Sequence, residues 1–79
     1  MARIIDGKAQ NMVGGKVRKL RTEQKMSQQM LSDRLETHAV YICRGSVSRI
    51  EDGQRTVTDI ELYGLAKVLG VSVEELYKE

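Results

Sequence analysis

The chain has 79 residues, of which 41% are hydrophobic and 30% charged, so it provides one domain with a single modest core. It contains no Trp, Phe or Pro, and its longer segments are rich in Leu, Lys, Arg, Glu and Gln, so we predict an all-α domain with an aliphatic core. The single cysteine excludes an internal disulfide, and no apolar run is long enough for a signal peptide or a transmembrane helix, so we expect a cytoplasmic protein.

Basic and acidic residues are unevenly distributed along the chain, although the formal net charge is only +2. Residues 14–55 hold nine Lys and Arg against five Asp and Glu, whereas residues 56–79 hold two against five. This distribution places the positive charge in the first part of the domain, as a phosphate-facing surface would require.

Residues 1–11 show no apolar periodicity, and we predict a flexible N-terminal arm there, ahead of a folded domain over residues 12–79. Such arms sometimes enter the minor groove of DNA. This one has only Arg3 and Lys8 as basic residues, which favours the simpler interpretation of a frayed terminus.

The first helix is predicted over residues 12–24, with Asn11 as its N-cap. Gly14 and Gly15 would each cost about 1 kcal/mol inside a helix. We therefore expect another backbone, from a neighbouring helix or a DNA phosphate, to approach them closely. The apolar residues of this helix recur at core-facing spacing and are Val13, Val17 and Leu20.

Four further helix starts are marked by a capping position that lies between two apolar residues, the pattern of a hydrophobic staple. These capping positions are Ser27, Cys43, Thr58 and Ser72. Glutamates three residues after Thr58 and Ser72 predict capping boxes. The predicted helices cover residues 28–37, 44–51, 59–69 and 73–77, which with the first make a compact five-helix bundle. Val40 and Ile42 should pin the connection between the second and third helices to the core.

The third predicted helix reads R-G-S-V-S-R-I-E over residues 44–51, and its clearly apolar residues are Val47 and Ile50. These two lie three residues apart and form one narrow inward stripe. The remaining face is basic, rich in hydroxyl groups and small residues, and suits insertion into the major groove of DNA. The alternative is an ordinary surface helix of a small bundle.

The string G-x-x-V-R-x-L-R…M-S-Q-x-x-L-S-x-x-L…S-V-S-R-I-E-D-G-x-R…L-A-K-V-L-G-V-S-V-E-E-L resembles the lambda-repressor-like (Xre/Cro-type) helix-turn-helix domain over residues 13–77. It looks like a subgroup with an extended connection between helices 2 and 3. Two positions depart from the family pattern. Cys43 stands where a Ser or Thr cap is usual and is a poorer acceptor, and Gly45 stands where a larger polar side chain is usual.

The resemblance implies a role for each matching residue, with the third helix in the major groove of double-stranded DNA. The implied base contacts are Arg44, Gly45, Ser46 and Arg49. The implied phosphate contacts are Gln28, Gln29, Ser48, Gln54 and Arg55. Arg21 and Glu51 would form an interior salt bridge between the first and third helices; the alternative is that both are exposed ions.

Other chemistry finds little support in the sequence. His38 and Cys43 do not supply enough ligands for a metal site, and no nucleophile–base set or phosphate-binding loop is present, so we expect no enzyme activity, metal, cofactor or small-molecule ligand. Cys43 would begin the third helix, where a helix dipole lowers a thiol pKa, and a redox sensor is one reading. The simpler one is a small, semi-buried substitute for a capping residue.

These features predict a sequence-specific transcriptional regulator, most simply a repressor that binds a two-half-site operator as a homodimer. The alternative is an antitoxin-like or adaptor protein that uses the same fold to dock another protein. Candidate residues for self-association are Tyr63, Val68 and Tyr77.

Overall fold

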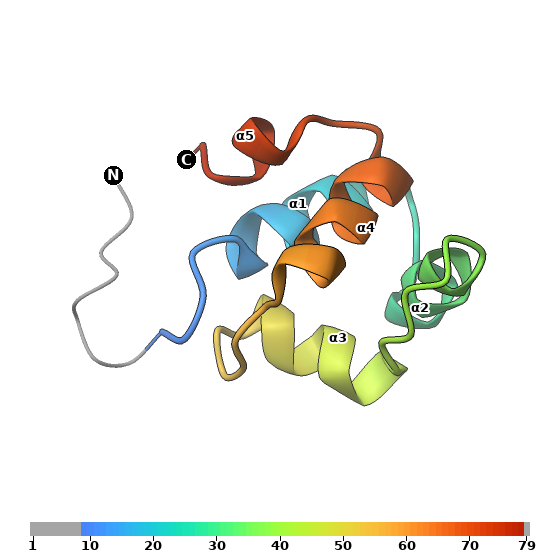
Figure 1. The fold of residues 1–79 in the computed structure, drawn as a ribbon, viewed down its shortest axis with the longest axis horizontal. Helices are drawn as coiled ribbons and strands as arrows, with labels where there is room; N and C mark the ends of the chain where they lie inside the picture. Colours follow the sequence, from blue (N-terminus) through green and yellow to red (C-terminus); the bar gives the residue numbers. More distant parts are fainter. Residues whose placement is uncertain (1–8, 79) are drawn as a thin grey trace.

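Five α-helices follow one another in a computed structural model that describes residues 9–78 (Figure 1). They are α1 (Gly14–Glu23), α2 (Gln28–Glu36), α3 (Arg44–Glu51), α4 (Asp59–Leu69) and α5 (Val73–Leu76). The predicted all-α, five-helix architecture is thereby confirmed. Residues 1–8 of the predicted arm lie outside the described residues.

The helix bounds follow the capping residues. α3 and α4 have the predicted bounds, and α2 and α5 each end one residue earlier. α1 begins at Gly14 rather than at residue 12, because the side-chain oxygen of Asn11 accepts hydrogen bonds from the backbone N–H groups of Val13 (3.0 Å) and Gly14 (2.7 Å). The N-cap of α1 is thus Val13 rather than the predicted Asn11, and the Asn11 side chain caps the first turn from two residues further upstream.

The predicted caps are present in three of these helices. Ser27 accepts from the backbone of Met30, and Thr58 forms a complete capping box with Glu61. Ser72 accepts from the backbone N–H of Glu75, but the Glu75 carboxylate lies 3.0 Å from Lys16 Nζ. The second half of that predicted box is thus replaced by an ion pair that ties α5 to α1.

The core is aliphatic, as predicted, and gathers apolar side chains from every helix and from the connection before α3. Val40 and Ile42 are buried, which confirms that this connection is pinned to the core. Among the described methionines, Met26 is buried, whereas Met12 and Met30 are each 39% exposed. The largest fully buried side chains are Leu31, Leu35, Ile50, Leu65, Leu76, Val17 and Val47.

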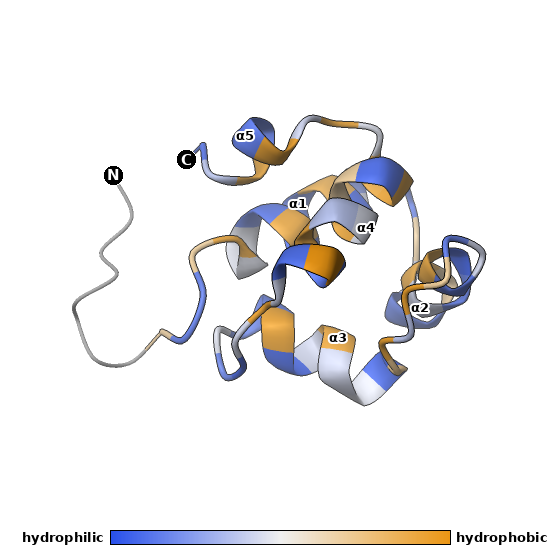
Figure 2. Cartoon of the chain, viewed as in Figure 1, coloured by the Kyte–Doolittle hydropathy of each residue, from blue (hydrophilic) through white to orange (hydrophobic). Residues whose placement is uncertain are grey.

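The arrangement leaves one face of α3 at the surface. α3 packs against α1 and α2, while α4 packs against α1, α2 and α5 (Figure 1). Apolar colouring accordingly concentrates on the inward sides of the helices, with an exception on the outer side of the first turn of α4 (Figure 2). None of the helices in residues 9–78 is both long and apolar enough to cross a membrane.

The paired glycines of α1 have different surroundings. A Cβ atom on Gly14 would lie 2.1 Å from the carbonyl oxygen of Ile50, so the backbone of α3 occupies the space of a side chain there. This confirms the predicted close approach for Gly14. A Cβ atom on Gly15 would meet nothing within 4 Å, so no neighbouring helix approaches that residue, and the close approach of a DNA phosphate to it stays a prediction.

Gly14→Ala is therefore expected to lower the free energy of unfolding by about 2 kcal/mol or more, because the α1–α3 contact has to separate. Gly15→Ala is the matched control and should raise it by up to about 1 kcal/mol through higher helix propensity. Urea unfolding of the two variants measures both effects. Equal stability of the two variants would contradict the close contact between Gly14 and Ile50.

Candidate nucleic-acid interface

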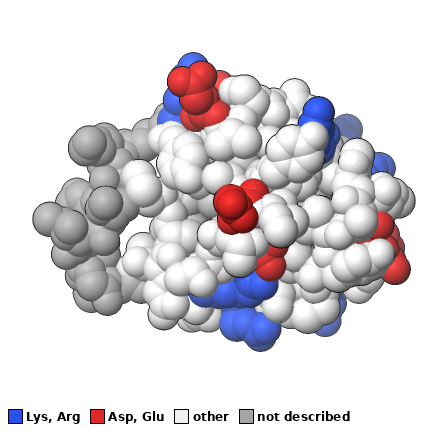
Figure 3. All heavy atoms as spheres, in the orientation of Figure 1, with Lys and Arg blue, Asp and Glu red and all other residues white. Residues whose placement is uncertain are grey.

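The sequence of α3 divides the helix into a buried and an exposed side. Val47 and Ile50 are each 1% exposed and anchor the helix in the core. Arg44, Gly45 and Arg49 are exposed on the other side. Lys and Arg side chains gather along the lower edge of the molecule, where α3 runs in the same orientation (Figure 3). The exposed side of α3 is therefore basic and free of acidic residues.

The two arginines of this face differ in their surroundings. Arg49 Nη2 donates a 3.0 Å hydrogen bond to the hydroxyl of Ser46, one turn earlier on α3. Arg44 has no hydrogen-bond or ion-pair partner among the described residues. Within residues 9–78, one exposed hydrogen bond is thus the only interaction that holds either guanidinium group, and both are available to a ligand. Ser46 and Ser48 are half-buried beside them.

Cys43 occupies the N-cap of α3 without a side-chain capping hydrogen bond. The thiol is exposed rather than semi-buried, which corrects the sequence-based expectation. It lies 3.5 Å from the Ser46 hydroxyl, and hydrogen bonding to Ser46 is the main cause that lowers the pKa of the Cys43 thiol. The start of α3 must therefore be fixed by something other than its cap.

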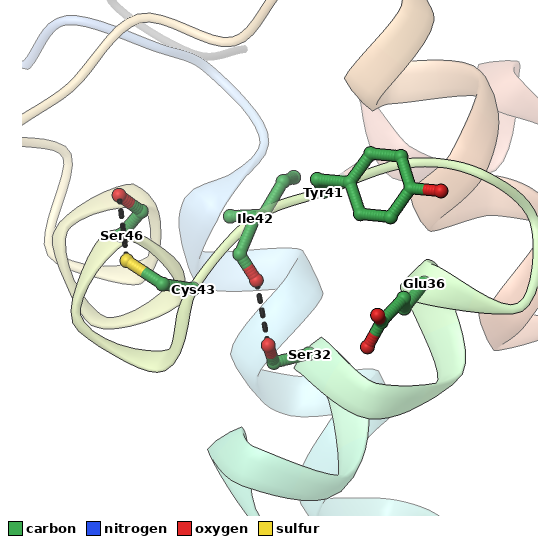
Figure 4. A pocket seen from close by; sticks show the side chains of 6 residues that line it. All are labelled: Ser32, Glu36, Tyr41, Ile42, Cys43 and Ser46. Carbon is green, nitrogen blue, oxygen red and sulfur yellow. Dashed lines mark hydrogen bonds between the residues drawn. The ribbon is translucent and has the colours of Figure 1, made fainter.

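The connection before α3 supplies that support. The Ser32 hydroxyl on α2 donates a 2.6 Å hydrogen bond to the carbonyl oxygen of Ile42, whose side chain is buried (Figure 4). An open groove of about 400 Å³ lies between α2 and the start of α3 (Figure 4). Cys43 and Ser46 line one end of it, and Tyr41 and Glu36 line the other. The hydrogen bond from Ser32 and the burial of Ile42 fix the position of the backbone just before Arg44.

The other end of α3 is fixed by a buried carboxylate. Glu51 is 5% exposed, and Arg21 reaches it with Nε 2.6 Å from Oε2 and Nη2 3.0 Å from Oε1. Arg21 also donates to the carbonyl of Met26 at 2.7 Å. Gln28 Nε2 and Arg18 Nε add hydrogen bonds of 3.1 and 3.3 Å to Oε1. Arg21 and Glu51 thus form the implied ion pair, and the cluster joins α1, α2 and α3.

Burial by itself would raise the pKa of Glu51. Hydrogen bonds from Arg21, Gln28 and Arg18 outweigh that effect and hold the pKa of Glu51 below its usual value. The carboxylate is therefore charged at neutral pH, and all of its strong partners are on the helices next to α3.

Arg55, in the turn after α3, and Glu61, in the first turn of α4, form a second ion pair. The Arg55 guanidinium donates to both carboxylate oxygens of Glu61, at 2.9 and 2.7 Å. Hydrogen bonding to Arg55 is the main cause that lowers the pKa of Glu61. The same carboxylate closes the capping box of α4, so the turn and the helix start share one anchor.

These two clusters predict a pH dependence of stability. Because the pKa values of Glu51 and Glu61 are lower in the folded protein, the unfolded chain binds more protons in acid. Their contribution is complete above the ordinary glutamate pKa of about 4.3 and is lost as pH falls through the folded-state values. The urea concentration at the unfolding midpoint should decrease once the pH is lowered below about 4. In Glu61→Gln the midpoint should depend less on pH. An acid-insensitive midpoint would contradict both ion pairs.

Four of the five implied phosphate contacts divide into two groups in the structure, and the fifth, Ser48, is half-buried on α3. Gln29 and Gln54 are exposed, with the Gln29 amide 2.9 Å from Asp33. The side chains of Gln28 and Arg55 are instead directed to Glu51 and Glu61. In the DNA-free protein Gln28 therefore connects α2 to α3, and Arg55 connects the turn after α3 to α4.

Sequence reasoning missed the part that Asn11 plays beyond capping α1. Its amide nitrogen donates to the carbonyl oxygens of Ile50 (3.0 Å) and Arg55 (2.9 Å), and Gln10 N–H donates to the carbonyl of Gly53 at 2.8 Å. Residues 9–11 thus lie against the end of α3. An Asn at a helix start signals a cap, but nothing in the local sequence indicates these distant partners.

The fold and the exposed basic helix define a helix-turn-helix DNA-binding protein, and comparisons with known proteins agree. A family model described as "Helix-turn-helix" matches residues 17–76. The chain belongs to this family, in its lambda-repressor-like (Xre-type) form, and is a DNA-binding transcription regulator. Among curated proteins, no sequence matches the chain significantly.

Two solved structures are similar to the chain over most of its length. The restriction-modification controller protein C.AhdI from Aeromonas hydrophila is 31% identical with a TM-score of 0.72, and the match covers 82% of this chain and 91% of that one. The DNA-binding domain of BldD is 33% identical with a TM-score of 0.68, over 87% and 92% of the two chains.

Proposed function

We propose that this protein is a sequence-specific repressor that binds a two-half-site operator as a homodimer, with α3 in the major groove. The observation that carries the proposal is the exposed basic side of α3, mounted on Val47 and Ile50 and locked at its end by Glu51. Arginine can pair bidentately with the O6 and N7 atoms of guanine. Arg44 and Arg49 would read bases in this way, with Ser46 beside them and Gly45 allowing close approach to the groove floor.

Phosphate contacts on either side of α3 would set its orientation in the groove. Gln29 and Gln54 are exposed and suited to this role, and Ser48 lies on the same helix. Gln28 and Arg55 would contribute by orienting the backbone N–H groups at the start of α2 and in the turn after α3. One of the similar structures is a controller protein and the other a DNA-binding domain, which supports a role in gene regulation.

A gel shift against genomic DNA fragments in rising salt tests the proposal. Fragments that contain a specific operator should stay bound to the protein at salt concentrations that release the other fragments, because base contacts do not depend on counterion release. If rising salt releases all fragments over the same concentration range, the result would favour the alternative, an adaptor protein that docks another protein. In transcription with purified polymerase, a template that carries the retained fragment as its promoter should yield less product as the protein is added; unchanged or increased product would contradict repression.

A further inference from the structure

The outer face of α4 carries apolar side chains that the core does not use. Ile60, in the first turn of α4, is 68% exposed, and Tyr63, one turn later, is 58% exposed. Asp59, Ile60, Tyr63 and Lys67 recur at helical spacing and form one stripe, which we call the α4 stripe. The face of the molecule over α4 is mostly uncharged, with a small acidic group near its centre and a basic group towards the end of α4 (Figure 3).

A groove of about 200 Å³ lies directly beside this stripe. It opens between the second half of α4 and the start of α5, and it has room for a branched aliphatic side chain. Its lining residues are Tyr63, Ala66, Lys67, Val71, Ser72 and Val73. The same face of the molecule therefore carries both a protruding apolar side chain, Ile60, and a recess that could receive one.

The charges of the α4 stripe are arranged symmetrically about Tyr63. Asp59 lies four residues before it and Lys67 four residues after it, about 6 Å along the helix axis in each direction. Within residues 9–78 neither charge forms an ion pair, and Lys67 Nζ lies 5.3 Å from the centre of the Tyr63 ring. A surface that is its own complement in this way suits a twofold interface.

We propose that the α4 stripe is the dimer interface, with α4 of two copies packed antiparallel across a twofold axis at Tyr63. In this register residue 59 lies opposite residue 67 of the second copy, and residue 60 lies opposite residue 66. Each Asp59 then meets a Lys67 from the other copy, and each Ile60 enters the groove beside the other Ala66. The inference rests on the proposed homodimer and names the surface that forms it.

The second copy fits this face better than an unrelated partner does. An unrelated partner would need its own side chain for the groove, its own recess for Ile60 and two opposite charges at the matching spacing. A second copy supplies all four at once, because the antiparallel arrangement exchanges the two ends of the stripe. Charge complementarity and register therefore select the same occupant.

Charge exchange between Asp59 and Lys67 tests the interface in the full chain by sedimentation equilibrium. Asp59→Lys and Lys67→Asp each place like charges opposite one another twice per dimer, and each should raise the dimer Kd at least about tenfold. A mixture of the two single variants should form heterodimers, in which both pairs are again opposite in charge. The double variant Asp59→Lys/Lys67→Asp should dimerise like the wild type.

Glu74→Lys is the matched control, because it reverses an exposed acidic residue in the first turn of α5 outside the α4 stripe. It should leave the dimer Kd unchanged, and circular dichroism should show that all variants are folded. Ile60→Ser gives a second test that involves no charge and should also raise the dimer Kd at least about tenfold. A wild-type dimer that tolerates the single variants, or single variants whose mixture stays monomeric, would overturn the interface.

DNA binding separates this inference from the proposed function. Wild-type protein that remains monomeric with and without its operator would overturn the dimer interface, while specific retention of DNA would still support reading by α3. Conversely, dimers that obey the charge exchange but retain no specific DNA would support the interface and contradict the proposed operator binding.

Discussion

Arg44→Ala combined with Arg49→Ala is expected to abolish sequence-specific DNA binding and to leave the melting temperature nearly unchanged. Each bidentate arginine–guanine contact is worth about tenfold to a hundredfold in discrimination between bases. Both side chains are exposed. Their one hydrogen bond to a described residue joins Arg49 to Ser46. The double variant should therefore lose its preference for the operator without losing its fold.

A mobility-shift titration with operator and random duplexes at two salt concentrations measures this loss. The residual binding should be equally weak for both duplexes and strongly dependent on salt, because phosphate contacts remain. Arg34→Ala is the matched control, since Arg34 is an exposed arginine in the last turn of α2. It should keep operator preference. A double variant that still prefers the operator would remove α3 from the proposed reading role.

Glu51→Ala is expected to produce the largest loss of stability. It leaves the guanidinium of Arg21, which is 12% exposed, without its carboxylate, and it removes the acceptor of Gln28. Removal of one partner from a buried ion pair costs about 3–5 kcal/mol. For a domain of this size that corresponds to a melting temperature lower by roughly 15 °C or more. Thermal and urea unfolding followed by circular dichroism measure the change.

Asp52→Ala provides the comparison for Glu51→Ala. Asp52 follows Glu51 and also pairs with Arg18, but it is exposed, and an exposed pair contributes at most about 1 kcal/mol. Arg21→Ala should resemble Glu51→Ala rather than Asp52→Ala, since it leaves the carboxylate buried and underpaired. An unchanged melting temperature in Arg21→Ala would show that the bridge does not hold α1 to α3.

Local capping signals account for most of what the sequence predicted correctly. Thr58 with Glu61 defined the start of α4, and Gly70, in a left-handed conformation with φ of 74°, ends it as a helix-terminating glycine should. The narrow stripe of Val47 and Ile50 likewise predicted which side of α3 is buried. In each of these cases the information lies within one or two turns of the residue concerned.

The directions of long polar side chains could not be predicted in the same way. The family resemblance implied that Gln28 contacts phosphate, yet its amide meets Glu51, 23 positions away in the sequence. Arg55 was expected to do the same and instead holds Glu61. These choices depend on which partner the tertiary fold brings near, and the pairing of Arg21 with Glu51 came from the family resemblance rather than from spacing.

Selection of bound duplexes from a random pool, performed in parallel with wild-type protein and Arg49→Ala, tests base reading by α3 most directly. The wild type should select two half-sites with centres about one helical turn apart and a guanine at a fixed place in each. Arg49→Ala should select the same half-sites with that one position unconstrained. If both proteins select an identical motif, Arg49 does not read the operator, and the proposed placement of α3 is contradicted.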